Sequence, residues 1–113
     1  NAAYLIWNNP YMAVGGATFI NDILNKCGLQ NIFADKERYP QITMADLHIA
    51  NCQLLLLSTE PYPFKQKDIN ELQKELPETK IILADGEMFS WYGSRLLQAP
   101  GYFIQLMKEI KKQ

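Results

Sequence analysis

The sequence has little net charge, few cysteines and no long hydrophobic run. Its 11 Lys and Arg residues are balanced by 12 Asp and Glu, which leaves a net charge of −1. Nucleic acid is therefore not an expected partner, because general polyanion binders carry a basic excess. The longest apolar run, Ala2–Trp7, is strand-sized and far below the about 20 residues of a membrane span. Cys27 and Cys52 have no CxxC spacing, so neither a disulfide framework nor a zinc site is expected.

What is present fits one ordinary globular domain. The chain has 113 residues, of which 48% are hydrophobic and 20% charged. A chain of this size can bury a sizeable core, and its composition is too apolar and too close to neutral for disorder.

Short apolar runs alternate with amphipathic segments along the chain. The runs predict buried strands at 4–7, 54–57 and 81–84, with a very short strand at 31–33. The segments between them predict helices over 18–27, 43–51 and 65–76, one beginning near Ser90 and a final one after Gly101. Thr43 and Asp46 resemble a capping box, with Asp in place of the usual Glu, and Gly28 suits the residue after a helix. We expect an α/β fold: a three-layer α/β/α arrangement around a mostly parallel, Rossmann-like sheet of about four strands.

Aromatic residues are concentrated where the expected strands end. In an open α/β sheet, ligands bind outside the carboxyl ends of the strands. One interpretation is that each ring packs beneath its loop as a satellite of the core. For the whole set we favour a binding edge covered by a large, partly apolar ligand. The set is Tyr11, Tyr39, Tyr62, Phe64, Phe89, Trp91 and Tyr92.

Groups suited to catalysis are sparse. The one histidine, His48, has Cys52 four residues later but no acidic partner to orient it, so we expect a helix-surface or core histidine. Glu60 and Glu87 are candidates for a carboxylate pair. One histidine is also a poor start for a bare-metal site, so no catalytic residue and no metal ligand is assigned.

A glycine pair, Gly15-Gly16, lies between a strand and a helix. Such a turn can cradle an anion, but it is neither GxGxxG nor a Walker loop, and a tight turn with close helix packing is the simpler interpretation. Arg38 and Arg95 are isolated cations near the expected carboxyl ends of the strands. One alternative function therefore stays open: a small α/β enzyme or nucleotide-binding domain that uses Gly15-Gly16 and Glu60/Glu87.

Several segments together resemble one protein family. The resemblance is to the C-terminal lobe of periplasmic substrate-binding proteins of cobalamin and ferric-siderophore ABC importers, the helical-backbone metal receptor type. It covers nearly the whole chain, in the right order. The segments are NPYMAVGGATF (9–19), CGLQNIF (27–33), YPQIT (39–43), STEPYPF (58–64) and DGEMFSWYGSRL (85–96).

This resemblance implies a lobe rather than a whole protein. Family members hold the ligand in a cleft between two α/β lobes that one long helix joins, so residues 1–113 are expected to be the C-terminal lobe, with the N-terminal lobe and linking helix absent. The implied function is solute binding for an ABC importer, with cobalamin or a related chelate such as a ferric siderophore or haem as ligand. No enzymatic activity and no cofactor of its own are implied, and the implied location is periplasmic or extracytoplasmic.

The resemblance also implies roles for individual residues. The position of Tyr39 often carries a ring that packs on the ligand, and the loop at 88–92 lines the cleft. An acidic residue of this lobe docks on the permease subunits; its position matches Ala45, and Asp46 stands next to it. An isolated lobe is expected to self-associate through its aromatic edge. The expected ligand-binding residues are Tyr39, Tyr62, Phe89, Trp91 and Tyr92.

Overall fold

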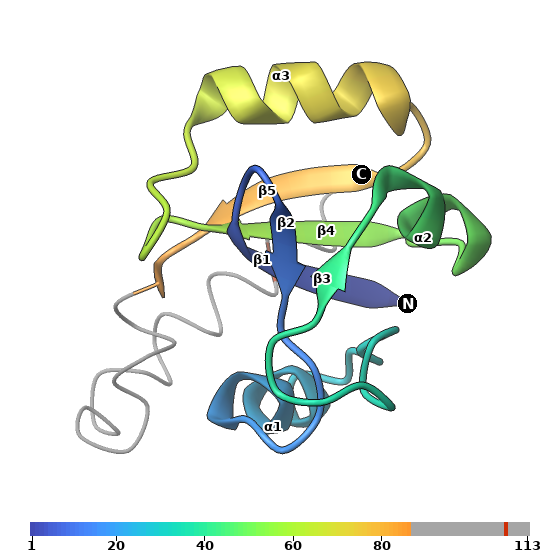
Figure 1. Ribbon diagram of the computed structural model, residues 1–113, viewed down its shortest axis with the longest axis vertical. Helices are drawn as coiled ribbons and strands as arrows, with labels where there is room; N and C mark the ends of the chain where they lie inside the picture. Colours follow the sequence, from blue (N-terminus) through green and yellow to red (C-terminus); the bar gives the residue numbers. More distant parts are fainter. Residues whose placement is uncertain (87–107, 109–113) are drawn as a thin grey trace.

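The core of the molecule is one five-stranded mixed sheet (Figure 1). The computed structural model describes residues 1–86 and 108. In chain order the strands are β1 (Ala2–Trp7), β2 (Tyr11–Ala13), β3 (Gln41–Ile42), β4 (Leu54–Ser58) and β5 (Lys80–Ala84), and across the sheet the order is β3-β2-β1-β4-β5.

The central part of the sheet is parallel. β1 pairs with β4 from Ala2↔Leu54 to Leu5↔Leu57, and β4 pairs with β5 from Leu54↔Lys80 to Ser58↔Ala84. Every residue of β4 is buried, because helices cover both faces of the sheet; this explains why its sequence is an unbroken apolar run. The predicted α/β class, the parallel core and the strand at 54–57 are confirmed.

The antiparallel side of the sheet was missed by the sequence analysis. β2 turns back along β1, with Leu5↔Ala13 and Trp7↔Met12 as partners, and β3 pairs antiparallel with β2. The expected strand at 31–33 is wrong, because only Asn31 joins the sheet, through an isolated parallel bridge to Ala2. These elements are too short for an alternating pattern to show.

The helices in residues 1–86 are α1 (Phe19–Lys26), α2 (Met44–Ile49) and α3 (Gln66–Glu75). The Thr43–Asp46 capping box is present, and α2 ends two residues before the expected Asn51. Gly28 follows α1 with a φ of 79°, as expected for the residue after a helix. The helices predicted after Ser90 lie outside the described residues.

Two hydrophobic clusters make the sheet the middle of three layers. One cluster joins Leu55 and Leu57 to Leu47 of α2 and Leu72 of α3. The other lies on the opposite face and joins Leu56 and the Tyr4 ring to Ile23 and Leu24 of α1. In Figure 1, α3 accordingly lies above the sheet and α1 below it.

Candidate functional site

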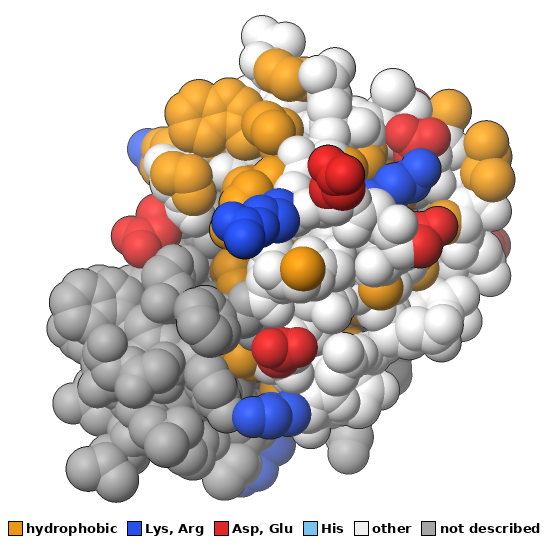
Figure 2. Space-filling model, turned by 60° about the horizontal axis from the view of Figure 1, so that its bottom comes forward, with side chains coloured by type: hydrophobic (Ala, Val, Ile, Leu, Met, Phe, Trp, Pro, Cys, Tyr) orange, Lys and Arg blue, Asp and Glu red, His pale blue; other side chains and the backbone are white. Residues whose placement is uncertain are grey.

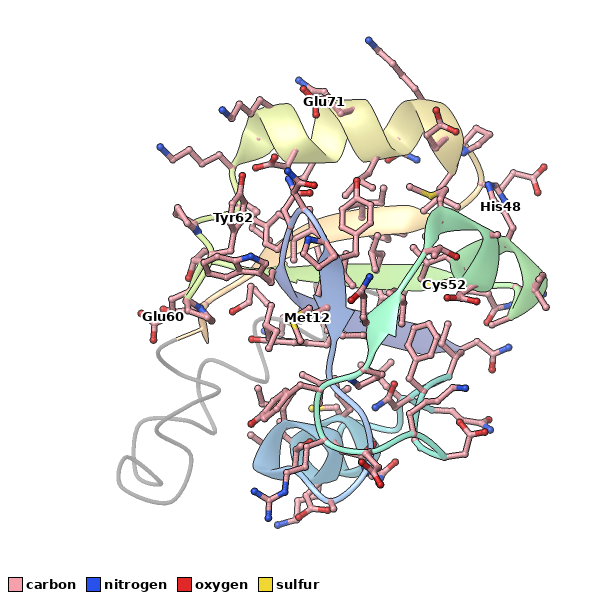
Figure 3. All side chains as sticks on the ribbon, in the orientation of Figure 1. Met12, His48, Cys52, Glu60, Tyr62 and Glu71 are labelled. Carbon is pink, nitrogen blue, oxygen red and sulfur yellow. The ribbon has the colours of Figure 1, made fainter. Side chains whose placement is uncertain are left out.

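The strands β1, β4 and β5 end at one edge of the sheet, which we call the carboxyl edge. Its described residues are Trp7, Asn8, Ser58–Tyr62, Asp85 and Gly86. Figure 3 shows Glu60 and Tyr62 on this side of the sheet, with His48 and Cys52 on the opposite side. In α/β sheets the carboxyl edge is where ligands bind, so it is the first place to look for a site.

A pair of aromatic rings lies at the carboxyl edge. The rings of Trp7 and Tyr62 meet edge to face, with centroids 5.5 Å apart and an interplanar angle of 75°. Trp7 is the last residue of β1 and is 39% exposed, which is unusual for so large an apolar side chain. Tyr62 is half-buried, and its hydroxyl accepts a hydrogen bond from the Asn8 side-chain amide at 3.5 Å. The pair therefore presents exposed apolar surface of Trp7, and the ring contact and the Asn8 hydrogen bond hold Tyr62 against it.

Trp7 is the residue that the sequence analysis missed. It closes the apolar run at Ala2–Trp7, so the sequence pattern predicts only the end of a buried strand there. The available signal was its position: Trp7 is a large ring at the carboxyl end of a parallel strand, which is where ligands bind in α/β sheets.

Two rings of the predicted aromatic set pack in or against the core. Phe64 is only 2% exposed, packs in the core and supports Tyr62 with ring centroids 4.7 Å apart. Tyr11 lies on β2 and is half-buried against the core cluster below α3. Burial, followed by the nearby Glu71 carboxylate, raises the pKa of Tyr11. For these two residues the satellite-core interpretation is correct.

Tyr39 lies beside the loop that leads into α1. Its side chain is 49% exposed and lines an open hollow of about 700 Å³ together with Ala17 and residues 36–40. Lys36, Glu37 and Arg38 put charges of both signs around this hollow. Figure 2, turned so that the α1 side comes forward, shows basic and acidic side chains interspersed among the described residues of that face.

The Gly15-Gly16 turn does not offer its amides to an anion. The Gly15 N–H donates to the Arg38 carbonyl at 2.8 Å, and the Gly16 N–H donates to the Lys36 carbonyl at 3.1 Å. A Cβ at Gly15 would lie 2.1 Å from the Glu37 carbonyl oxygen, so the glycine is required by this close approach of two backbones. The tight-packing interpretation of the pair is correct.

His48 and Cys52 line a hollow of about 440 Å³ at the opposite edge of the sheet. His48 is exposed on α2, as expected, whereas Cys52 is buried and its thiol donates to the Leu54 carbonyl at 3.2 Å. Burial raises the pKa of the Cys52 thiol to about 11. A thiol held neutral in this way is a poor nucleophile at neutral pH, so the two residues do not form a catalytic pair.

Asp46 has a structural role in the helix cap. Its carboxylate accepts a hydrogen bond from the Thr43 N–H at 2.8 Å, and the Asp46 N–H donates to the Thr43 hydroxyl at 3.2 Å. The side chain is half-buried at the start of α2. The docking role that the resemblance implied stays a prediction.

The remaining predicted residues, Phe89, Trp91, Tyr92, Glu87 and Arg95, lie outside the described residues. Within residues 1–86, no three His, Cys, Asp or Glu side chains converge in a way that could hold a metal ion. None of the three helices described there is long and apolar enough to cross a membrane.

Comparisons with known proteins identify the fold. No protein-family model and no curated protein matches the sequence. Among solved structures, a possible iron-binding (periplasmic solute-binding) protein of Staphylococcus epidermidis superimposes with a TM-score of 0.77 at 21% identity, over 98% of this chain and 45% of its own. The chain has the fold of one lobe of the periplasmic solute-binding proteins.

Two proteins of Vibrio cholerae give the same result. The periplasmic vitamin B12-binding protein BtuF superimposes with a TM-score of 0.71 at 18% identity, over 99% of this chain and 45% of its own. The periplasmic heme-binding protein HutB superimposes with a TM-score of 0.75 at 13% identity, over 97% of this chain and 46% of its own. The chain thus spans less than half the length of each of these proteins.

Proposed function

We propose that the chain is the C-terminal lobe of an extracytoplasmic solute-binding protein that delivers a metal chelate to the permease of an ABC importer. The ligand would be cobalamin, haem or a ferric siderophore. It would lie against the carboxyl edge, in a cleft closed by a second lobe. Trp7 and Tyr62 would contact it, together with the predicted Tyr39, Phe89, Trp91 and Tyr92.

The observation that carries this proposal is the exposed Trp7–Tyr62 pair on a fold shared with periplasmic binding proteins. Two rings set edge to face present a broad apolar surface with few rotatable bonds. Such a surface suits a large, flat, partly apolar ligand, which binding sites bury largely against aromatic side chains. Two of the structurally similar proteins are by name B12-binding and heme-binding.

The alternative, a small nucleotide-binding domain or enzyme, has lost the feature on which it depended. It needed free N–H groups at Gly15 and Gly16, and both donate to backbone carbonyls. Glu60, the described member of the supposed carboxylate pair, is exposed at the carboxyl edge. The carboxyl edge therefore favours binding over bond chemistry.

The direct test is titration of the full-length protein with cobalamin, hemin and ferrioxamine. We expect one of these chelates to bind, and Trp7→Ala to weaken that binding roughly 5- to 150-fold, by analogy with the loss of one ring stacked on a base. Ile49→Ala is the matched control, because Ile49 is an apolar side chain of α2 that is 84% exposed and lies away from the carboxyl edge. Failure of all three chelates to bind, or equal affinities for the two variants, would contradict the proposal.

A further inference from the structure

One hydroxyl of the carboxyl edge, that of Ser58, is buried. Ser58, the last residue of β4, is 1% exposed. Its Oγ accepts a hydrogen bond from the Tyr4 hydroxyl at 3.1 Å and another from the Glu60 N–H at 3.3 Å, and it donates to the Glu60 carbonyl at 2.5 Å. One proton and two lone pairs are all that a serine hydroxyl offers, so its hydrogen-bonding capacity is fully used.

These bonds fix the turn at Glu60–Tyr62 relative to the centre of the sheet. The Tyr4 side chain is completely buried on β1 and packs in the cluster below the sheet. At the other end of the turn, the Tyr62 N–H donates to the Ile6 carbonyl at 3.3 Å, which brings the Tyr62 ring against Trp7. The turn therefore takes its position from buried groups that a ligand at the edge would not reach.

The same turn is in close contact with the segment that leaves β5. The Thr59 N–H donates to the Ala84 carbonyl at 3.0 Å, and the Gly86 N–H donates to the Thr59 hydroxyl at 3.0 Å. A Cβ at Gly86 would lie 2.5 Å from the Ser58 Oγ and 2.6 Å from the Glu60 Cγ. Gly86 thus lets the segments that follow β4 and β5 meet, and Ser58 lies at their junction.

We propose that Tyr4 and Ser58 are positioning residues for the carboxyl edge: their hydroxyl pair sets the Glu60–Tyr62 turn, and through it the Tyr62 ring and the position of Gly86. The consequence for binding rests on the proposed function. Without the hydroxyl pair, the turn spends part of its time outside the binding conformation. The apparent affinity is then reduced in proportion to the fraction of molecules that keep the binding conformation.

The experiment compares three hydroxyl deletions in the full-length protein. Tyr4→Phe and Ser58→Ala each remove one partner of the pair. Thr79→Val is the matched control: Thr79 is 7% exposed, and its hydroxyl donates to the Cys52 carbonyl at 2.8 Å at the opposite edge of the sheet. Two quantities are measured: hydrogen exchange of the amides of residues 59–64 by mass spectrometry, and the affinity for cobalamin, hemin and ferrioxamine.

We expect Tyr4→Phe and Ser58→Ala to speed exchange in residues 59–64 and to weaken chelate binding about three- to tenfold, the equivalent of one buried hydrogen bond. Thr79→Val should leave both quantities at their wild-type values. If Ser58→Ala does not fold, the isosteric Tyr4→Phe decides alone. Unchanged exchange in Tyr4→Phe, or equal loss of affinity in Thr79→Val, would overturn the inference.

The two proposals fail in different ways. If the wild-type protein binds none of the three chelates, the proposed function is wrong, and the exchange of residues 59–64 alone decides whether the hydroxyl pair positions the turn. If the wild-type protein binds a chelate and Tyr4→Phe binds it equally well, the positioning role is wrong and the proposed function stands.

Discussion

Each of the two edges of the parallel sheet contains a buried hydroxyl that donates a hydrogen bond to a backbone carbonyl, but the two bonds hold different kinds of structure. At the opposite edge, where β1, β4 and β5 begin and which we call the amino edge, the Thr79 hydroxyl donates to a backbone carbonyl. The Asn1 carbonyl accepts there from the N–H groups of Gln53 and Leu54. At the carboxyl edge, the Ser58 hydroxyl also donates to a backbone carbonyl, but the turn that it holds carries a half-exposed ring. The Thr79 hydroxyl therefore stabilises the core at the amino edge, whereas the Ser58 hydroxyl positions a partly exposed surface at the carboxyl edge.

This contrast separates stability from function within one small domain. At the amino edge, Cys52 is buried and belongs to the core cluster. At the carboxyl edge Trp7 keeps 39% of its surface exposed, although its strand is otherwise deeply buried. Substitutions at the two edges should therefore give different ratios of lost stability to lost affinity.

The largest loss of stability is expected for a substitution at Leu56, which lies in the middle of β4, between the two edges. Leu56 is fully buried on β4, so Leu56→Ala leaves a cavity that affects both edges together. We expect the free energy of unfolding to fall by about 2–5 kcal/mol in denaturant titrations. A loss within about 0.5 kcal/mol, the range usual for surface substitutions, would show that Leu56 is not a core residue.

The amino edge should lose stability in alkaline solution. The folded-state pKa of Cys52 is about 11 and its reference value is 9.0. Below pH 9 the thiol is protonated in both states and contributes no pH dependence. As the pH rises from 9 to 11 only the unfolded thiol ionises, so the free energy of unfolding should fall by up to roughly 3 kcal/mol.

Cys52→Ala isolates this effect, because lysines and tyrosines titrate in the same range. The difference in unfolding free energy between wild type and Cys52→Ala should shrink from pH 9 to 11 and be constant from pH 6 to 8. A difference that stays constant up to pH 11 would mean that Cys52 reaches solvent in the folded protein. Chelate affinity, measured at pH 7, should not change in this variant.

The sequence predicted elements with a clear local pattern better than the short strands at the antiparallel side of the sheet. The Leu54–Leu57 run and the Thr43–Asp46 cap were correctly interpreted, because a buried strand and a capping box each have a local pattern. The β2 strand was missed, because its pairing with β1 depends on contacts that no three-residue pattern encodes. The site was predicted only in part for the same reason: Phe64 and Tyr62 look alike in sequence, yet one is buried and the other is half-exposed.

Two glycine substitutions sharpen the contrast between the edges. Gly86→Ala places a Cβ against Ser58 and Glu60, so the turn at the carboxyl edge has to shift. We expect a loss of about 1–3 kcal/mol in stability, as for other overpacked sites, together with weaker chelate binding.

Gly28→Ala is the control, because Gly28 follows the C-terminal end of α1 and lies outside the carboxyl edge. No atom lies within 4 Å of the added methyl, and the cost there comes from the φ of 79°. It should lower stability by about 1 kcal/mol and leave affinity unchanged. Unfolding curves and chelate titrations of both variants check this, and equal affinities would contradict the role given to Gly86.

The smallest expected effect concerns Asp46, where a structural and a functional role can be separated. The carboxylate caps α2 by accepting the Thr43 N–H, so Asp46→Ala should cost about 1 kcal/mol of stability. Asp46→Asn keeps an oxygen in the same place and removes only the charge, so its stability should stay near that of wild type. If the charge docks on a permease, Asp46→Asn should bind the chelate normally and yet lower uptake in cells, because docking depends on the negative charge and capping does not. Normal uptake with Asp46→Asn would leave the helix cap as the function of this carboxylate and move the search for the docking residue to another surface of the lobe.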